Sequence, residues 1–296
     1  MREKKNVLQD VKEYTKNNND IKALLITSST VNPHAKTDIF SDLDLVIVTD
    51  KPKKFSNKKE WRKELGDILV SFNDSFKLEA IKTYTRLVLY QDHIRIDFSI
   101  WPVKLIKKLT TYDKLPDYLD IGYEVLYDKD NITDKLKRPT YQAFKTKIPS
   151  EEQYRITVND FWWDITYIPK YLWRDQFYFM KYMDYFIKFN LLQPMVEWLI
   201  GVENNWAVNP GKCGSKFQEY LSEEDWKQLE TTFSGYDREE NWQALFKMME
   251  FFQKAAKKVG KSLGYEYPQK LDDDVREYVN KIYDKEVPFN KMEKGE

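Results

Sequence analysis

The spacing of apolar residues divides the chain into two parts. Before about residue 140, short apolar runs alternate with stretches of helical period, a pattern that predicts strands mixed with helices. Beyond that point apolar residues recur every three or four positions, as in amphipathic helices. We therefore expect an α+β protein with a mixed sheet and helices in a domain over residues 1–140, and an α-helical domain over residues 141–296. The Lys-, Asp- and Pro-containing stretch 128–150 is the expected linker.

In the first part, Val7, Leu8, Val11 and Tyr14 have helical spacing that stops at the asparagines from Asn17. A second helix is expected over residues 61–69. Strands are expected over residues 23–27, 43–48, 86–90, 94–100 and 123–127. Because only a short polar stretch separates the third and fourth of these strands, they should form an antiparallel hairpin.

The second part should consist of helices over residues 151–173, 176–204, 222–233, 239–262 and 272–284. Ser150, followed by Glu151 and Glu152, favours a helix start at that point. Glycines 211 and 214 indicate a loop, and Gly235 and Pro268 indicate breaks between helices.

Composition narrows the chemistry. Lys and Arg number 48, as do Asp and Glu, so the formal charge is zero and a uniformly basic nucleic-acid surface is excluded. No apolar run is long enough to span a membrane and the N-terminus has no signal-peptide core, so we expect a cytoplasmic protein with no membrane partner. With one cysteine and two histidines, a disulfide framework and a Cys/His zinc site are excluded. Catalysis must then rest on carboxylates, a lysine or a bound metal.

Three carboxylates are the strongest candidates. Asp42 and Asp44 lie two residues apart at the start of an expected strand, so both side chains leave one face, about 6.5 Å apart along the backbone. Asp97 lies on a later strand, on the same face as Arg95 and Ser99. Carboxylates gathered on adjacent strands suit Mg²⁺, which prefers oxygen ligands. The simpler alternative is that Asp42 belongs to a turn and Asp44 pairs with a lysine.

A hydroxyl-rich turn adds to this pattern. Residues 27–30, Thr-Ser-Ser-Thr, follow the first expected strand, where backbone N–H groups and hydroxyls can bind phosphate oxygens. A strand, a turn of small residues, Asp-x-Asp on the next strand and Asp on a later one is the arrangement of nucleotidyltransferases.

The whole chain resembles the aminoglycoside 6-adenylyltransferases, the enzymes that adenylate streptomycin and confer resistance to it. The Phe-Trp-Trp segment is the most specific match. The matching segments are Ser29 with Asn32, 40–44 with 48–50, 96–97 with Pro102, 125–130, 160–163, 166–167, 190–192, 211–212, 220–222 with Trp226, and Tyr265 with Tyr267 and Pro268.

The resemblance implies a polymerase-β-like nucleotidyltransferase domain, a helical substrate-binding domain, and Mg²⁺-dependent transfer of AMP from ATP to an aminoglycoside hydroxyl. Asp42, Asp44 and Asp97 would be the catalytic and metal-binding residues, with Asp97 either a ligand or the base. The implied nucleotide-binding residues are Ser28, Ser29, Asn32 and Lys212. One departure is that residues 28–30 read Ser-Ser-Thr where the family usually has Gly-Ser-Arg, which removes a glycine and a positive charge. Lys212 is expected to compensate for the missing charge.

A cationic acceptor has independent support. Asp160 and Asp164 are four residues apart on one expected helix face, where two like charges repel. Trp163 and Tyr167, like Trp162, can stack on a sugar or a guanidinium group. Asp160, Trp163, Asp164 and Tyr167 are therefore the candidate acceptor-binding residues. Alternatively, the tryptophans fill a core and the aspartates pair with Arg155 or Lys170.

Other functions stay open at this point. One is a catalytically weakened nucleotide-binding or regulatory homologue, given the altered turn. Another is a nucleotidyltransferase with a protein or other small-molecule acceptor; the charge balance argues against nucleic acid as a partner. The sequence leaves ATP against GTP open, as well as a monomer against a homodimer.

Overall fold

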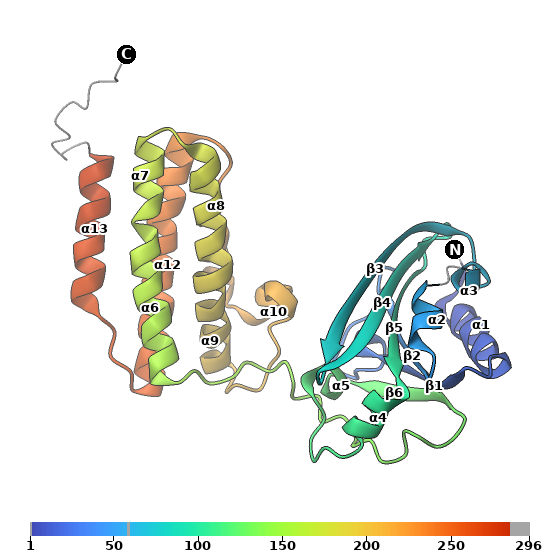
Figure 1. Cartoon of the computed structure of the whole chain (residues 1–296). Coiled ribbons are helices and arrows are strands. Elements are labelled where there is room, and N and C mark those ends of the chain that lie inside the picture. The colour runs from blue at the N-terminus through green and yellow to red at the C-terminus, as the bar shows by residue number, and fades with distance from the viewer. Residues whose placement is uncertain (1, 58–59, 285–296) are drawn as a thin grey trace. The chain divides into compact units, whose positions relative to one another are not determined.

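The computed structural model describes residues 2–57 and 60–284 of the chain (Figure 1). They form two compact units, Met1–Phe144 and Lys145–Glu296. The structural division falls a few residues beyond the boundary expected after residue 140. The end of the expected helical domain, 285–296, lies outside the described residues.

The first unit is built on one mixed sheet of six strands in the order β3-β4-β5-β2-β1-β6. Strands β2 and β5 pair in parallel and the other neighbours pair antiparallel. The strands are β1 (Ile21–Thr27), β2 (Leu43–Thr49), β3 (Ile68–Leu78), β4 (Ile81–Tyr90), β5 (Arg95–Pro102) and β6 (Tyr123–Asp128). The expected hairpin between β4 and β5 is confirmed.

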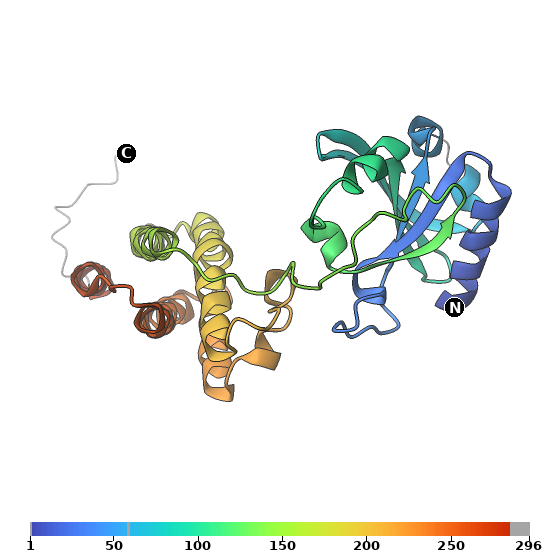
Figure 2. The same ribbon diagram turned by 90° about the horizontal axis from the view of Figure 1, so that it is seen from below.

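Helices cover the two faces of this sheet (Figure 2). Their bounds are α1 (Lys4–Asn17), α2 (Pro52–Asn57), α3 (Glu60–Lys63), α4 (Val103–Leu109) and α5 (Asp117–Asp120). Alternate residues of β2 divide between the two faces. Leu43 and Leu45 pack with residues of α1 and α2, whereas Val46 and Val48 pack with residues of α4 and α5. Each face thus has its own buried cluster.

The helix expected over residues 61–69 is wrong beyond its first residues. Helix α3 ends at Lys63, and Ile68 and Leu69 already belong to β3. Gly66 lies between the two elements with φ 146°, a conformation that interrupts a helix and that residues with a side chain rarely adopt. Strand β3 was missed from the sequence because it is an edge strand with both faces largely exposed, so its apolar and polar residues do not alternate regularly.

The second unit is a bundle of helices with one large core (Figure 1). The helices are α6 (Glu151–Ile165), α7 (Tyr167–Trp173), α8 (Phe177–Ile187), α9 (Gln193–Glu203), α10 (Phe217–Tyr220), α11 (Glu223–Glu230), α12 (Arg238–Leu263) and α13 (Gln269–Tyr283). The α+β class predicted from the sequence is confirmed. No helix within residues 2–57 and 60–284 has the length and apolarity that crossing a membrane requires.

Two long helices expected in this unit are interrupted. The first breaks at Thr166, whose hydroxyl donates to the Trp163 carbonyl at 2.7 Å, and Pro169 has no N–H with which to continue the helical ladder. The second contains a π-helical segment, Lys188–Leu192, just before Pro194. Pro194 likewise lacks an N–H for the turn that precedes it.

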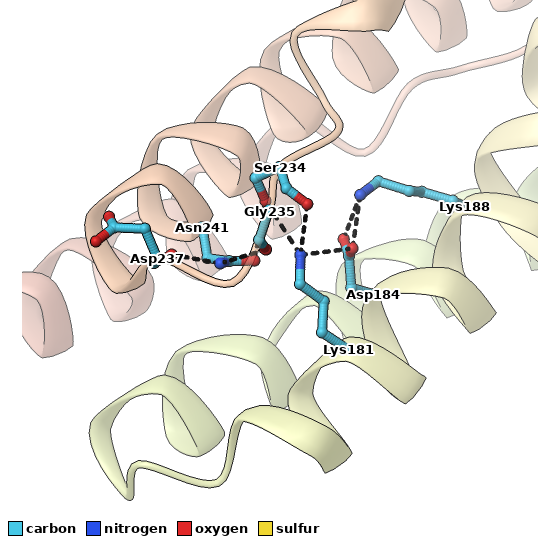
Figure 3. A network of polar contacts seen from close by, with 7 residues as sticks. All are labelled: Lys181, Asp184, Lys188, Ser234, Gly235, Asp237 and Asn241. Carbon is cyan, nitrogen blue, oxygen red and sulfur yellow. Dashed lines mark hydrogen bonds and ion pairs between the residues drawn. The ribbon is translucent and has the colours of Figure 1, made fainter.

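A buried polar network links α8 and the π-helical segment to the start of α12 (Figure 3). The Lys188 ammonium donates to both Asp184 oxygens, at 2.6 and 2.7 Å. Lys181 lies 3.9 Å from the same carboxylate and donates to the Ser234 carbonyl at 3.0 Å. Burial lowers the pKa of both lysines, and the shared carboxylate opposes that change. We assign this network a structural role within the bundle.

Candidate functional site

Two neighbouring strands bring the three candidate carboxylates together. In the parallel register of β2 with β5, Asp44 pairs with Asp97, and Asp42 immediately precedes β2. Asp44 and Asp97 lie on the face that carries Val46 and Val48. Helices α4 and α5 cover the valine end of this face, and the carboxylates lie at the other end, partly exposed. The sequence-based expectation of carboxylates on adjacent strands is confirmed for Asp44 and Asp97.

The environment of Asp42 and Asp44 disfavours negative charge. Burial, with the neighbouring charges of Asp97 and Asp42, raises the pKa of Asp44 to about 6, although a hydrogen bond from the Ser28 hydroxyl and the charge of Arg95 oppose the rise. The pKa of Asp42 is also raised, chiefly by burial and also by Asp97, against Arg95. Acidic groups held this close together are stabilised by a nearby positive charge.

Arg95 supplies part of this positive charge. The sequence had indicated no role for it. Its Nε and one terminal nitrogen donate to the two oxygens of Asp97, at 3.0 and 3.1 Å. The same Nε lies 3.3 Å from Asp42. These contacts raise the pKa of Arg95 further, so it stays charged. The signal in the sequence was its position two residues before Asp97, which puts both side chains on one face.

The candidate ligands are carboxylate oxygens, the type of ligand that Mg²⁺ prefers. Within the described residues, no cluster of three or more His, Cys, Asp or Glu side chains is arranged to enclose a metal ion as it stands. The Arg95 guanidinium lies between Asp42 and Asp97 instead. Adjacent carboxylates with raised pKa values are nevertheless the hard oxygen ligands that Mg²⁺ takes, and a divalent cation would relieve their repulsion. The magnesium site stays a prediction.

The hydroxyl-rich turn lies directly beside these carboxylates. Ser28–Thr30 form one 3₁₀ turn at the end of β1, and β1 pairs with β2 so that Thr27 faces Asp44. The Ser28 hydroxyl bonds to Asp44, and the Thr30 hydroxyl donates to the Asp42 carbonyl at 3.3 Å. Ser29 belongs to the same turn. The structure therefore brings the predicted phosphate-binding turn and the predicted metal-binding carboxylates together.

The Asn32 side chain forms hydrogen bonds that stabilise this loop. Its amide nitrogen donates to the Ile121 carbonyl at 2.8 Å and its oxygen accepts from the His34 amide at 2.8 Å. Gly122 lies against the Asn32 backbone. A Cβ atom added to this glycine would be 3.5 Å from that backbone. These contacts hold the loop in place.

Lys212 lies in the second unit. It opens a short 3₁₀ turn, Lys212–Gly214, after Gly211 with φ 81°, and its side chain is exposed. An exposed ammonium on a glycine-bounded turn is available to an anionic ligand. Its part in nucleotide binding stays a prediction.

The four candidate acceptor residues lie at the junction of α6 and α7. Trp163 is 66% exposed, whereas Trp162 is fully buried in the bundle core. The alternative that the tryptophans fill a core therefore holds for Trp162 and not for Trp163. Burial and the nearby charge of Asp160 raise the pKa of Asp164. Neither aspartate forms an ion pair with Arg155, Lys170 or any other described residue. Lys170 instead lies 4.2 Å from the centre of the Tyr167 ring.

A further group of aromatic residues went unnoticed in the sequence. On α8 and the π-helical segment, six aromatic side chains are between 40% and 87% exposed: Tyr178, Phe179, Tyr182, Tyr185, Phe186 and Phe189. The signal was available, because aromatic residues in this stretch occupy more of the helix circumference than one buried face can hold.

Several known proteins are similar to this chain over nearly its whole length. An aminoglycoside 6-adenylyltransferase of Campylobacter jejuni is 28% identical over 283 residues, covering 94% of this chain and 95% of the relative. One of Bacillus subtilis is 25% identical, covering 96% and 99%. The crystal structure of an aminoglycoside 6-adenyltransferase from B. subtilis aligns with 96% of this chain and 99% of its own at 19% identity, with a TM-score of 0.44. The family model of streptomycin adenylyltransferase matches residues 1–282, so the chain belongs to that family of nucleotidyltransferase enzymes.

Proposed function

We propose that this enzyme transfers AMP from ATP, with Mg²⁺, to a hydroxyl group of a streptomycin-type aminoglycoside. The observation that supports this most directly is the grouping of Asp42, Asp44 and Asp97 beside the Ser28–Thr30 turn. Family membership makes nucleotidyl transfer the relevant reaction. The relatives are named as aminoglycoside 6-adenylyltransferases, which supports an aminoglycoside acceptor.

The order of the strands suggests which residues bind the phosphates and which act on the acceptor hydroxyl. The turn follows β1, Asp44 lies on the central strand β2, and Asp97 lies on β5, beyond β2 from the turn. The turn would hold the phosphates with its amide and hydroxyl groups, which leaves the β5 side for the acceptor. Asp97 would then orient the attacking hydroxyl and accept its proton as the bond from the α-phosphorus to pyrophosphate breaks. Mg²⁺ bound by Asp42 and Asp44 would supply charge stabilisation.

The second unit would bind the acceptor. The repulsion between Asp160 and Asp164 has no counter-charge among the described residues, so an aminoglycoside cation would relieve it. The exposed Trp163 ring beside them offers a surface for a sugar or guanidinium group. Both features fit a polycationic carbohydrate better than an uncharged acceptor.

The test of the reaction is transfer of label from [α-³²P]ATP to a panel of aminoglycosides. We expect a labelled product with streptomycin in the presence of Mg²⁺. Asp44→Asn should reduce the rate at least 100-fold, whereas Asp50→Asn, an exposed aspartate just after β2, should leave it unchanged. ATP binding without transfer to any aminoglycoside would contradict the proposal and favour the nucleotide-binding homologue, whose turn has lost the family's glycine and arginine.

The acceptor site has its own test. Trp163→Ala and Asp164→Asn should each raise the KM for streptomycin about 5- to 30-fold, the range expected for losing one stacking or charge contact, with little change in the KM for ATP. Asp273→Asn, an exposed change on α13, serves as the matched control. An equal rise in both KM values would mean that the substitutions disturb the enzyme generally.

A further inference from the structure

The Arg95 side chain lies between two of the candidate carboxylates, Asp42 and Asp97. Arg95 binds Asp97 through two nitrogens, at 3.0 and 3.1 Å, and its Nε lies 3.3 Å from Asp42. A guanidinium that bonds to both oxygens of one carboxylate uses the lone pairs that face it. Asp97 therefore has little capacity left to coordinate a metal ion from the same side.

A bound divalent ion and this arrangement of Arg95 disfavour each other. Two positive charges within a few ångströms repel, and a metal ion held by Asp42 and Asp44 would need the same Asp42 carboxylate that Arg95 contacts. The side chain of Arg95 is 46% exposed, so it can leave without unpacking the core.

Resting on the proposed function, we propose that Arg95 is a positioning residue that acts as the counter-cation of the metal-free site. It holds Asp42 and Asp97 together and opposes binding of a divalent ion that arrives alone. A nucleotide changes this balance because its phosphates offer the released guanidinium another anionic partner. Metal and nucleotide should therefore bind with positive coupling, each strengthening the other by the same factor, and Arg95 is the source of part of that coupling.

The test measures binding rather than turnover. Mn²⁺, used as the probe, is titrated into the full-length protein and followed by electron paramagnetic resonance, with and without α,β-methylene-ATP. For the unsubstituted protein we expect weak Mn²⁺ binding alone and tighter binding with the analogue. Arg95→Gln should tighten Mn²⁺ binding in the absence of nucleotide by about tenfold, because one competing positive charge is gone. It should also reduce the enhancement that the analogue produces.

Two further variants make the result specific. Arg95→Lys keeps the charge without the two-pronged geometry and should give an intermediate Mn²⁺ affinity. Arg2→Gln removes an arginine that pairs with Asp92 at 2.6 Å in the same unit, so it makes the same change in net charge without removing a contact to Asp42 or Asp97. Its Mn²⁺ affinity should equal that of the unsubstituted protein. Circular dichroism checks that each variant is folded.

Two results would overturn the inference. In one, Arg95→Gln leaves Mn²⁺ affinity unchanged in the absence of nucleotide. In the other, it weakens binding of the analogue while Mn²⁺ affinity alone stays the same, which would make Arg95 a phosphate ligand only. Failure of the proposed function is a separate result, because it appears as absence of AMP transfer by the unsubstituted enzyme whatever Arg95 does to Mn²⁺ binding.

Discussion

Ser28 adopts a backbone conformation that normally favours glycine. Its φ is 65°, in the left-handed region, where a Cβ atom costs about 1–2 kcal/mol. It occupies the position at which the family usually has the glycine of Gly-Ser-Arg. Ser28 therefore adopts a left-handed conformation without being glycine, and its hydroxyl bonds to Asp44.

Comparing two substitutions at this position separates strain from hydrogen bonding. Ser28→Ala removes the hydroxyl and keeps the strain, whereas Ser28→Gly removes both. We expect Ser28→Gly to be more stable to urea than Ser28→Ala by about 1 kcal/mol. Equal stability of the two variants would show that the left-handed conformation carries no cost in this turn.

Asp44 should reduce the stability of the metal-free fold at neutral pH. Its folded pKa of about 6 lies above the usual value of 3.8, so between about pH 4 and pH 6 the folded state binds more protons than the unfolded state. Stability contributed by this group is therefore lost as the pH rises through that window. In EDTA, Asp44→Asn should be more stable than the unsubstituted protein by about 2 kcal/mol at pH 7 and nearly equal to it at pH 4.

Urea titrations at the two pH values check this prediction, with Asp50→Asn as the control that changes the same charge at an exposed position. A stability difference independent of pH would mean that the gain comes from the amide itself. If Asp44→Asn is instead destabilising at pH 7, the carboxylate is stabilised in the fold, and its burial and its repulsion with Asp97 do not dominate.

At the scale of elements, the sequence predicted most of what positions the site. The strand patterns in 43–48 and 94–100 were enough to put Asp44 and Asp97 on strands, and the direction of each side chain then follows from its own strand. The parallel pairing of β2 with β5 could not be read in the same way, because residues far apart in the chain determine which strands become neighbours. Strand β3 was missed because both of its faces are largely exposed, and the contact of Arg95 with Asp42 depends on the pairing of β2 with β5, so local patterns did not reveal them.

Helix α13 carries a fully buried charged residue that bonds to neighbouring side chains of the bundle. Asp272 is fully buried; it accepts from Arg276 Nε at 2.5 Å and from the Tyr267 hydroxyl at 2.7 Å, and also pairs with Gln253 of α12. Tyr267 in turn accepts from the buried Trp162 ring nitrogen at 3.0 Å. The sequence showed an Asp-rich helix start but gave no sign that the first of its three aspartates is inside.

Removing this carboxylate should be costly. Asp272→Ala leaves the charge of Arg276 and the Tyr267 hydroxyl without their partner, so we expect a loss of about 3–5 kcal/mol in the stability of the second unit. Asp273→Ala, one residue further along on the exposed side, should change stability by less than about 0.5 kcal/mol. Similar effects of the two substitutions, measured by chemical denaturation, would show that the network adds no stability.

At the scale of the whole molecule, the two units have separate cores. The cluster built from Tyr154 to Ile282 draws only on the second unit, and the two clusters on the faces of the sheet draw only on the first. The change in hydrophobic period along the chain indicated this division, because each period serves a different kind of core. The position of the division, between Phe144 and Lys145, falls in a stretch without regular secondary structure, where periodicity offers no signal.

Separate cores predict separate unfolding events. Differential scanning calorimetry of the full chain should resolve two transitions, because a core that is wholly within one unit makes that unit cooperative by itself. Asp272→Ala should lower only one transition, and Asp44→Asn at pH 7 in EDTA should raise only the other. Ligands extend the assignment: since the predicted metal site lies in the first unit, Mn²⁺ with α,β-methylene-ATP should raise the transition that responds to Asp44→Asn. If both substitutions shift a single common transition, the two units unfold together, and the prediction that each unfolds by itself is wrong.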